Sequence, residues 1–418
     1  MLGNNYLCAL DISSSKIAAI VSQIRKGRIG EIFFEIAPSR GIKYGTVVDP
    51  IELVNSITAV LKSLKNSSGI NIKYLSANIS GQDISTRHSR AIIPLAERGN
   101  KVITPSDIYK ANEQARILGS SLEEEIIHSV PYNYAIDSKT DILNPAGLYS
   151  HRLEVDLYLI FAKLAGVQSL GRAINQSGYE IRDFFFSGLA TSAAIFGSDT
   201  REGVEVVCDI GSDTTEMLIF RNGRLSDIKI VSIGGDDITG KLSDELKIPF
   251  ELAEEVKRAH ALVGDHIQLA EEKEILIKKQ DIYKPIKEKI IVEITTQEAK
   301  RLCQVIKDKL DKMVPTQRIA NFICCGRTVM LDGFLETLEN TLGVSVKLAR
   351  LANPEISGLA TRYDALAGQR YLAYLTALGL LCQSLHRQQS LTLYTPEPPR
   401  SIFIKVFNKV REVYQEYF

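Results

Sequence analysis

Residues 7–14 read LCALDISS and residues 206–212 read VVCDIGS, two apolar stretches that each end in Asp-Ile and a turn of small residues. A second apolar run follows in both places and then a matching turn, KGR at 26–28 and NGR at 222–224. Apolar runs separated by such turn signals are typical of β-hairpins. The chain therefore contains an internal repeat, in which two related hairpins open its two halves.

The aspartates of the repeat, Asp11 and Asp209, have two interpretations. Small residues let backbone N–H groups approach phosphate oxygens, and an aspartate beside them can hold a hydrated divalent cation. In a single tight hairpin, the aspartate more often accepts only local backbone hydrogen bonds. Duplication favours the first interpretation, because two such hairpins facing each other form a phosphate clamp between lobes.

The rest of the chain alternates helices and strands, which predicts an α/β fold. Thr104-Pro105-Ser106-Asp107 has the side chains of a capping box with proline at the first helical position, and Thr295-Thr296-Gln297-Glu298 predicts a second helix start, with that helix reaching about Met313. An inserted βαβ-type unit is expected at about 85–161, and 264–289 is a hydrophilic segment. Helices are predicted at 53–64, 105–118, 167–177, 188–196, 251–262 and 331–341, and strands at 74–79, 153–162 and 319–326.

Length and composition limit the class of protein. The 418 residues are 45% hydrophobic, enough for more than one core, since single cores stop growing at about 250–300 residues. Fifty basic residues balance fifty acidic ones, so we expect no nucleic acid partner. The six cysteines have no CxxC spacing, which favours a reduced cytoplasm and no metal site. We expect no signal peptide and no membrane span, because no apolar run approaches about 20 residues.

The C-terminal residues predict an amphipathic helix at 400–418, which follows a proline-rich linker at 395–399. Apolar residues recur every three or four positions, and basic residues lie beside them. Such a helix can simply pack on its own domain, but a rigid linker and cationic flanks favour a helix lying in anionic headgroups. The residues predicted to bind the membrane are Phe403, Lys405, Val406, Phe407, Lys409, Val410, Arg411, Tyr414 and Tyr417.

Several segments together resemble the FtsA family of bacterial cell-division proteins. These are the paired hairpins, APSRGIKYGTVVDP at 37–50, SVPYNYAID at 129–137, NPAGL at 144–148, the turn at Gly326 and the amphipathic end. The resemblance spans nearly the whole chain and implies a two-lobed, actin-like (duplicated ribonuclease H-like) α/β fold. The implied parts are a first lobe (1–84 and 163–200), an FtsA-type inserted subdomain of SHS2 type (85–162), a second lobe (201–235 and 316–394), its insertion (236–315), the linker (395–399) and the helix (400–418).

The resemblance also implies an ATP site with Mg²⁺ between the lobes. Four departures from the family pattern weaken it, because Ser13, Ser212, Asp213 and Arg327 stand where the family has glycine. We expect weakened or lost nucleotide binding and negligible hydrolysis, hence no enzyme. The residues carried over as cofactor-binding are Asp11, Ser14, Lys16, Asp209, Gly211, Thr214, Gly235, Glu254, Lys257 and Gly326.

The implied function is a scaffold that tethers filaments of the tubulin-like protein FtsZ, the Z ring, to the cytoplasmic face of the cell membrane. Its expected partners are the FtsZ C-terminal tail, further copies of itself, anionic lipids and later division proteins. Lys300 and Arg301 are candidates for the tail contact, although Glu298 takes the place of a basic residue common in the family. The alternatives are a pilus-assembly protein like PilM, whose family lacks the C-terminal anchor, and a sugar or acid kinase, which needs intact phosphate loops.

Overall fold

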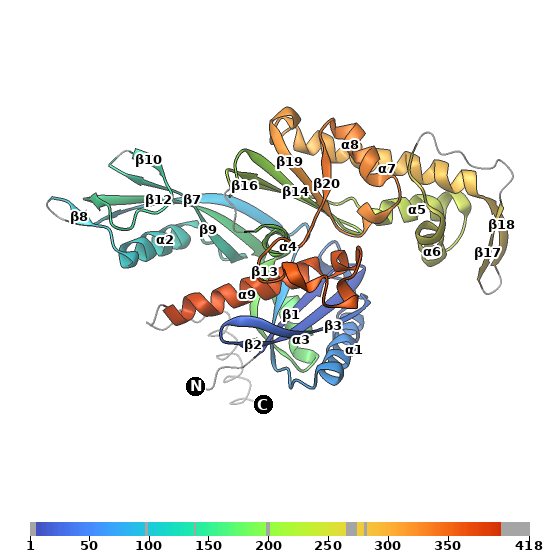
Figure 1. Cartoon of the computed structure of the whole chain (residues 1–418), viewed down its shortest axis with the longest axis horizontal. Helices are drawn as coiled ribbons and strands as arrows, with labels where there is room; N and C mark the ends of the chain where they lie inside the picture. Colours follow the sequence, from blue (N-terminus) through green and yellow to red (C-terminus); the bar gives the residue numbers. More distant parts are fainter. Residues whose placement is uncertain are drawn as a thin grey trace.

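The computed structural model describes residues 6–96, 99–137, 139–197, 201–264, 274–279 and 282–393. The predicted linker and membrane helix, at 395–399 and 400–418, lie outside the described residues. Figure 1 shows two lobes, the first below the second, with one extension toward the left and another toward the right.

The first lobe is built on a five-stranded sheet in the order β13-β6-β1-β2-β3. β1, β2 and β3 form an antiparallel meander, while β6 and β13 run parallel to β1. Side chains alternate along β1, so that Leu10 packs with helix α1 on one face and Ala9 with helix α9 on the other. The elements of this lobe are β1 (Tyr6–Ile12), β2 (Lys16–Arg25), β3 (Arg28–Pro38), β4 (Ile42–Lys43), β5 (Thr46–Val47), α1 (Pro50–Ser68), β6 (Tyr74–Ile79), α3 (Leu164–Gln176), β13 (Glu180–Phe186) and α4 (Ser187–Ile195).

The second lobe repeats this topology in the order β16-β15-β14-β19-β20. Its first three strands are antiparallel, and β19 and β20 run parallel to β14. The hairpin turns also match, since Lys26 and Asn222 both have φ near +50° and each precedes a glycine with positive φ. The predicted internal repeat is therefore confirmed. The elements are β14 (Val204–Ile210), β15 (Thr215–Arg221), β16 (Arg224–Val231), η1 (Thr316–Arg318), β19 (Ile319–Cys325), η2 (Thr328–Met330), α8 (Phe334–Leu342), β20 (Val346–Leu348), η3 (Ser357–Leu359), η4 (Asp364–Leu366), η5 (Arg370–Ala373) and α9 (Leu375–Leu393).

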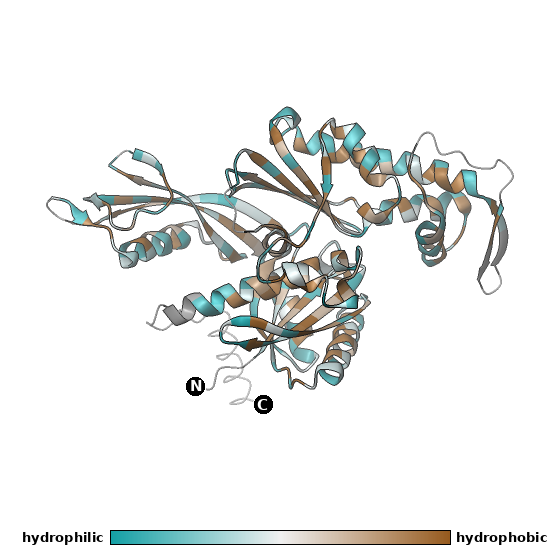
Figure 2. Cartoon of the chain, in the orientation of Figure 1, coloured by the Kyte–Doolittle hydropathy of each residue, from teal (hydrophilic) through white to brown (hydrophobic). Residues whose placement is uncertain are grey.

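Helices α4 and α9 join the two lobes. One continuous hydrophobic core contains Ile20 of the first sheet, Leu218 of the second, Ala190 of α4 and Leu381 of α9. Figure 2 shows the strands of both lobes mostly in brown, while the helices change between brown and teal along their length, as expected of amphipathic helices covering a sheet. In the described part of the chain, no helix combines the length and apolarity that a membrane span requires.

The inserted subdomain is the extension on the left of Figure 1, a four-stranded sheet in the order β10-β9-β12-β7 with helix α2 against it. Both β7 and β9 are antiparallel to β12, so they run parallel to each other on its two sides as a split βαβ unit. The predicted capping box is confirmed, because Thr104 and Asp107 exchange hydrogen bonds at the start of α2. The elements are β7 (Ile84–Pro94), β8 (Lys101–Val102), α2 (Pro105–Gly119), β9 (Glu124–Ile136), β10 (Lys139–Ile142), β11 (Tyr149–Ser150) and β12 (Arg152–Lys163).

The extension on the right belongs to the second lobe and corrects one prediction. Its longest helix begins at Glu288, so Thr295 lies inside the helix and caps nothing. The Thr295 hydroxyl donates to the carbonyl oxygens of Ile291 and Leu262, at 2.9 and 2.8 Å, which explains a polar residue on the buried face. The elements are α5 (Gly235–Leu246), α6 (Phe250–His260), β17 (Glu274–Lys279), β18 (Ile282–Lys287) and α7 (Glu288–Leu310).

Candidate functional site

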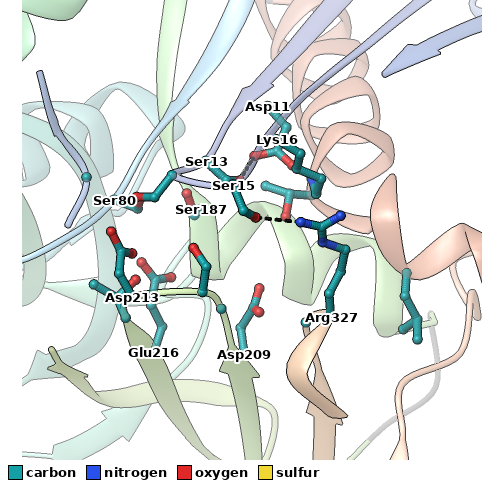
Figure 3. A pocket seen from close by; sticks show the side chains of 18 residues that line it. Asp11, Ser13, Ser15, Lys16, Ser80, Ser187, Asp209, Asp213, Glu216 and Arg327 are labelled. Atoms are coloured by element: carbon teal, nitrogen blue, oxygen red, sulfur yellow. Dashed lines mark hydrogen bonds and ion pairs between the residues drawn. The ribbon is translucent and has the colours of Figure 1, made fainter. Parts of the chain in front are cut away.

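The two repeated hairpins face each other across a cleft between the lobes. The β1–β2 and β14–β15 loops line a cavity of about 80 Å³, the inner cavity, which Figure 3 shows. A neighbouring cavity of about 320 Å³, the outer cavity, lies toward α5 and α6. Seven of the ten predicted cofactor residues line the inner cavity, namely Asp11, Ser14, Lys16, Asp209, Gly211, Thr214 and Gly326. The other three, Gly235, Glu254 and Lys257, line the outer cavity.

Asp11 is the most fully bonded group of the inner cavity. Its carboxylate pairs with the Lys16 ammonium, accepts from the Ser13 hydroxyl at 3.0 Å and accepts from the Asn78 side-chain amide at 3.0 Å. Asp11 is only 1% exposed, so these donors replace the water that its charge has lost. The ammonium of Lys16 is consequently committed to a neighbour on its own hairpin.

Asp209 and Glu216 form an acidic pair on the opposite hairpin, directly across β14 and β15 from each other. Burial, with the negative charge of Asp11 second, raises the pKa of Asp209 to about 6. Burial and then the charge of Asp209 raise the pKa of Glu216 to about 8. The backbone N–H groups of Gly81 and Gly188 approach the Glu216 carboxylate, but among the described residues it has no hydrogen bond of ordinary geometry. Glu216 therefore favours its protonated, neutral form near neutral pH.

Two departures noted in the sequence make bonds across the cleft. The Arg327 guanidinium, in the turn after β19, donates to the Ser15 hydroxyl at 2.8 Å, as the dashed line in Figure 3 marks. The carboxylate of Asp213 accepts a hydrogen bond from the backbone N–H of Tyr44 in the first lobe. Asp213 thus lines the inner cavity, and its carboxylate is engaged by the opposite lobe.

The outer cavity contains a closed polar network. The Lys257 ammonium donates to the Gly235 carbonyl at 2.9 Å and to the Thr239 hydroxyl at 2.7 Å, and it lies 2.6 Å from Glu254. Glu254 also pairs with Arg258. Met330 and Leu331 add apolar surface to the same cavity. A cavity of this size, with both apolar and polar walls, suits a nucleoside.

The residues present do not fit a magnesium triphosphate in the inner cavity. Carboxylates of Asp11, Asp209 and Asp213 line a small space together with the carboxyl group of Glu216, and the Lys16 ammonium is already paired. Such carboxylates can hold a hydrated Mg²⁺, but phosphate oxygens that approach them directly in so small a space would meet like charge at short range. The part of the chain that the structure describes also holds no group of three or more His, Cys, Asp or Glu side chains arranged to bind a metal ion. The nucleoside side of the cleft is therefore better formed than the phosphate side.

Several residues of the cleft could not be identified from the sequence. Asn78, Tyr44 and Ser187 carry no local signal, since their partners are far away in the chain. Glu216 does carry a local signal, because it is a charged residue inside the otherwise apolar strand TEMLIF at 215–220. A charge at a buried strand position is unusual unless it serves a site.

The predicted partner residues lie exposed on α7. The Arg301 guanidinium pairs with the buried Glu298, and also with Asp237 of α5 at 3.0 Å. Lys300 occupies the adjacent position on the same helix. A partner carboxylate that binds Arg301 must compete with two acidic residues of the protein. The nine predicted membrane-binding residues, 403–417, lie outside the described residues.

Two family models match the chain. The model described as "Cell division protein FtsA" matches residues 206–379, and the one described as "SHS2 domain inserted in FTSA" matches residues 81–161. The chain belongs to the FtsA family. Curated FtsA proteins of Pseudomonas aeruginosa and Escherichia coli K12 are each 24% identical to this FtsA-family chain, over 91% and 89% of it and over 90% and 88% of their own lengths. It is thus a cell-division protein of the actin-like class.

Solved structures agree on the fold. The PilM-PilN type IV pilus biogenesis complex has a chain that matches with a TM-score of 0.61 and 16% identity, over 91% of this chain and 98% of that one. MreB5 of Spiroplasma citri bound to AMPPNP matches with a TM-score of 0.51 and 10% identity, over 93% and 98%. At these identities the likeness concerns the fold alone, and it confirms the predicted actin-like architecture. The similarity to PilM gives no support to a role in pilus assembly.

Proposed function

We propose that this FtsA-family protein is a division scaffold that binds the C-terminal tail of FtsZ, lies on the cytoplasmic face of the membrane and assembles with copies of itself. One observation carries the proposal: FtsA models match both the second lobe and the inserted subdomain of the same chain. The inserted subdomain presents several exposed apolar side chains, among them Tyr109, Ile117 and Leu122. Such surface supports a contact with a neighbouring subunit or with later division proteins.

Attachment to the membrane is assigned to residues 400–418, on the sequence pattern alone. An amphipathic helix with basic flanks binds an anionic surface through buried apolar area and charge together. One helix of this length binds reversibly. Assembly into filaments would place many such helices side by side and raise the effective affinity without any new contact.

Truncation after Pro399 tests this attachment. The shortened protein is expected to keep its folded circular dichroism spectrum and to lose sedimentation with vesicles containing anionic lipid. Val406→Glu, on the apolar stripe, should also abolish binding, whereas Asn408→Glu adds the same charge off the stripe and should weaken binding only slightly. Unchanged sedimentation of the truncated protein would contradict the proposal.

Nucleotide binding is proposed to be weak and hydrolysis negligible. The crowded acidic inner cavity and the committed Lys16 ammonium support this. Titration with mant-ATP and Mg²⁺ should give a dissociation constant above about 10 μM, that is, a binding free energy weaker than about −7 kcal/mol. A submicromolar constant, or steady phosphate release, would rule out a degenerate site.

The contact with FtsZ is assigned to the insertion at 236–315, which contains α5, α6 and α7. Lys300 and Arg301 would attract an acidic peptide there. Because Arg301 already pairs with Glu298 and Asp237, the Coulomb gain from a new carboxylate is reduced, and we expect apolar contacts to supply much of the affinity.

A further inference from the structure

Two side chains of the second lobe reach across the cleft and bond to the first lobe. Arg327 donates to the Ser15 hydroxyl at 2.8 Å, and Asp213 accepts from the backbone N–H of Tyr44. Gln82 and Ser232 add a third contact at the edge of the cleft. The first two contacts lie in the cavity walls. Ser15 and Arg327 line both the inner and the outer cavity, and Asp213, which lines the inner cavity, is 5% exposed.

The donor side of the Asp213 contact is held in place by the first lobe. Tyr44 and Gly45 form a turn between β4 and β5 with φ of +50° and +76°. The turn packs against the backbone after β6, where a Cβ on Gly81 would lie 2.1 Å from the Tyr44 carbonyl oxygen. Tyr44 therefore presents its N–H as a fixed part of the lobe, and the Asp213 bond reports how the two lobes are placed.

Arg327 stands on the path between the two cavities. It lines the inner and the outer cavity, and Figure 3 shows its side chain extended toward Ser15. Carboxylates from both sides attract its charge, Asp11 in the first lobe and Asp236 and Glu254 in the second. A ligand that places a base in the outer cavity and phosphates in the inner one has to displace this guanidinium.

We propose that Arg327 and Asp213 hold the two lobes together in the place that the family resemblance gives to a nucleotide. The inference rests on the proposed degenerate nucleotide site. The closed arrangement of the lobes then depends on the chain's own side chains. Nucleotide binding would therefore not change the placement of the lobes. Assembly would then be controlled by membrane attachment and partner binding.

The test compares the full chain with Arg327→Ala, Ser15→Ala and a matched control, Arg318→Ala. Arg318 is an exposed arginine at the opposite end of β19 from the cleft. Hydrogen exchange is followed in peptides covering 42–47 and 80–84, with and without Mg-ATP. This comparison of variants involves neither lipid nor mant-ATP, so its failure is separate from failure of the vesicle experiment and of the nucleotide titration.

We expect exchange in the unaltered protein to be the same with and without Mg-ATP. Arg327→Ala should exchange at least about five-fold faster in both peptides, and Ser15→Ala should exchange faster to a smaller degree. Arg318→Ala should match the unaltered protein. The inference is overturned if Arg327→Ala shows unchanged exchange, or if Mg-ATP slows exchange in the unaltered protein. Should Arg327→Ala fail to fold, unchanged exchange in Ser15→Ala overturns it equally.

Discussion

Replacing Gly379 by alanine is expected to destabilise the protein by about 3 kcal/mol, at the upper end of the usual range for overpacking. Gly379 lies on α9 where this helix crosses α4, the pair that joins the two lobes. A Cβ built there would lie 1.7 Å from the carbonyl oxygen of Ala190 and 2.4 Å from its carbonyl carbon. Because both atoms belong to helix backbone, no side chain can turn away, and the helices must separate.

Gly240→Ala is the matched control for this prediction. Gly240 also lies inside a helix, α5, but a Cβ there has no atom within 4 Å. Alanine should stabilise that helix by about 0.5–1 kcal/mol through its lower conformational entropy in the unfolded chain. Urea unfolding followed by circular dichroism therefore gives shifts of opposite sign. Equal urea midpoints for the two variants would mean that α4 and α9 can separate without loss of unfolding free energy.

The repeated hairpins could be predicted because their signals are local. Alternation of apolar residues, the Asp-Ile ends and the turns at 26–28 and 222–224 all act within a few residues, and the structure keeps the same backbone turn in both. The capping box at Thr104 is equally local and was also correct. From these pieces and the family resemblance, the sequence predicted two lobes and placed ten residues around one cleft.

The predicted helix start at Thr295 was wrong because residues that precede the motif already belong to the helix. Thr295 and Glu298 have the right spacing, but the apolar period of α7 already begins around Ile291. A serine or threonine inside a helix can bond back to the carbonyl four residues earlier, as Thr295 does. A helix start is better placed where the apolar period begins than at the nearest capping motif.

The bonds across the cleft could not be predicted from local pattern. Asp213 and Tyr44 are 169 residues apart, and Arg327 and Ser15 are 312 apart. The sequence identified Asp213 and Arg327 as unusual at glycine positions, but it gave neither of them a partner. Only the placement of one lobe against the other, which depends on the shared core around α4 and α9, gives each of them a partner.

Glu216→Gln is expected to stabilise the protein by about 3 kcal/mol at pH 8.5 and to have little effect at pH 5. Glu216 is 4% exposed, and burial followed by the charge of Asp209 raises its pKa from 4.5 to about 8. A carboxyl group with a raised folded pKa binds more protons in the folded than in the unfolded chain. The stability that this protonated carboxyl group contributes to folding is therefore fully present below about pH 4.5 and is lost as the pH rises through 8.

The glutamine variant removes this titration because its amide stays neutral and keeps the shape of the side chain. It also offers N–H donors beside Asp209, the cross-strand partner of Glu216. Urea midpoints measured from pH 5 to 9 should fall steadily for the unaltered protein and much less for the variant, while Glu31→Gln, at an exposed position on β3, should follow the unaltered protein. A parallel fall in the variant would place the pH dependence at another group and would leave Glu216 charged in the fold, beside the N–H groups of Gly81 and Gly188.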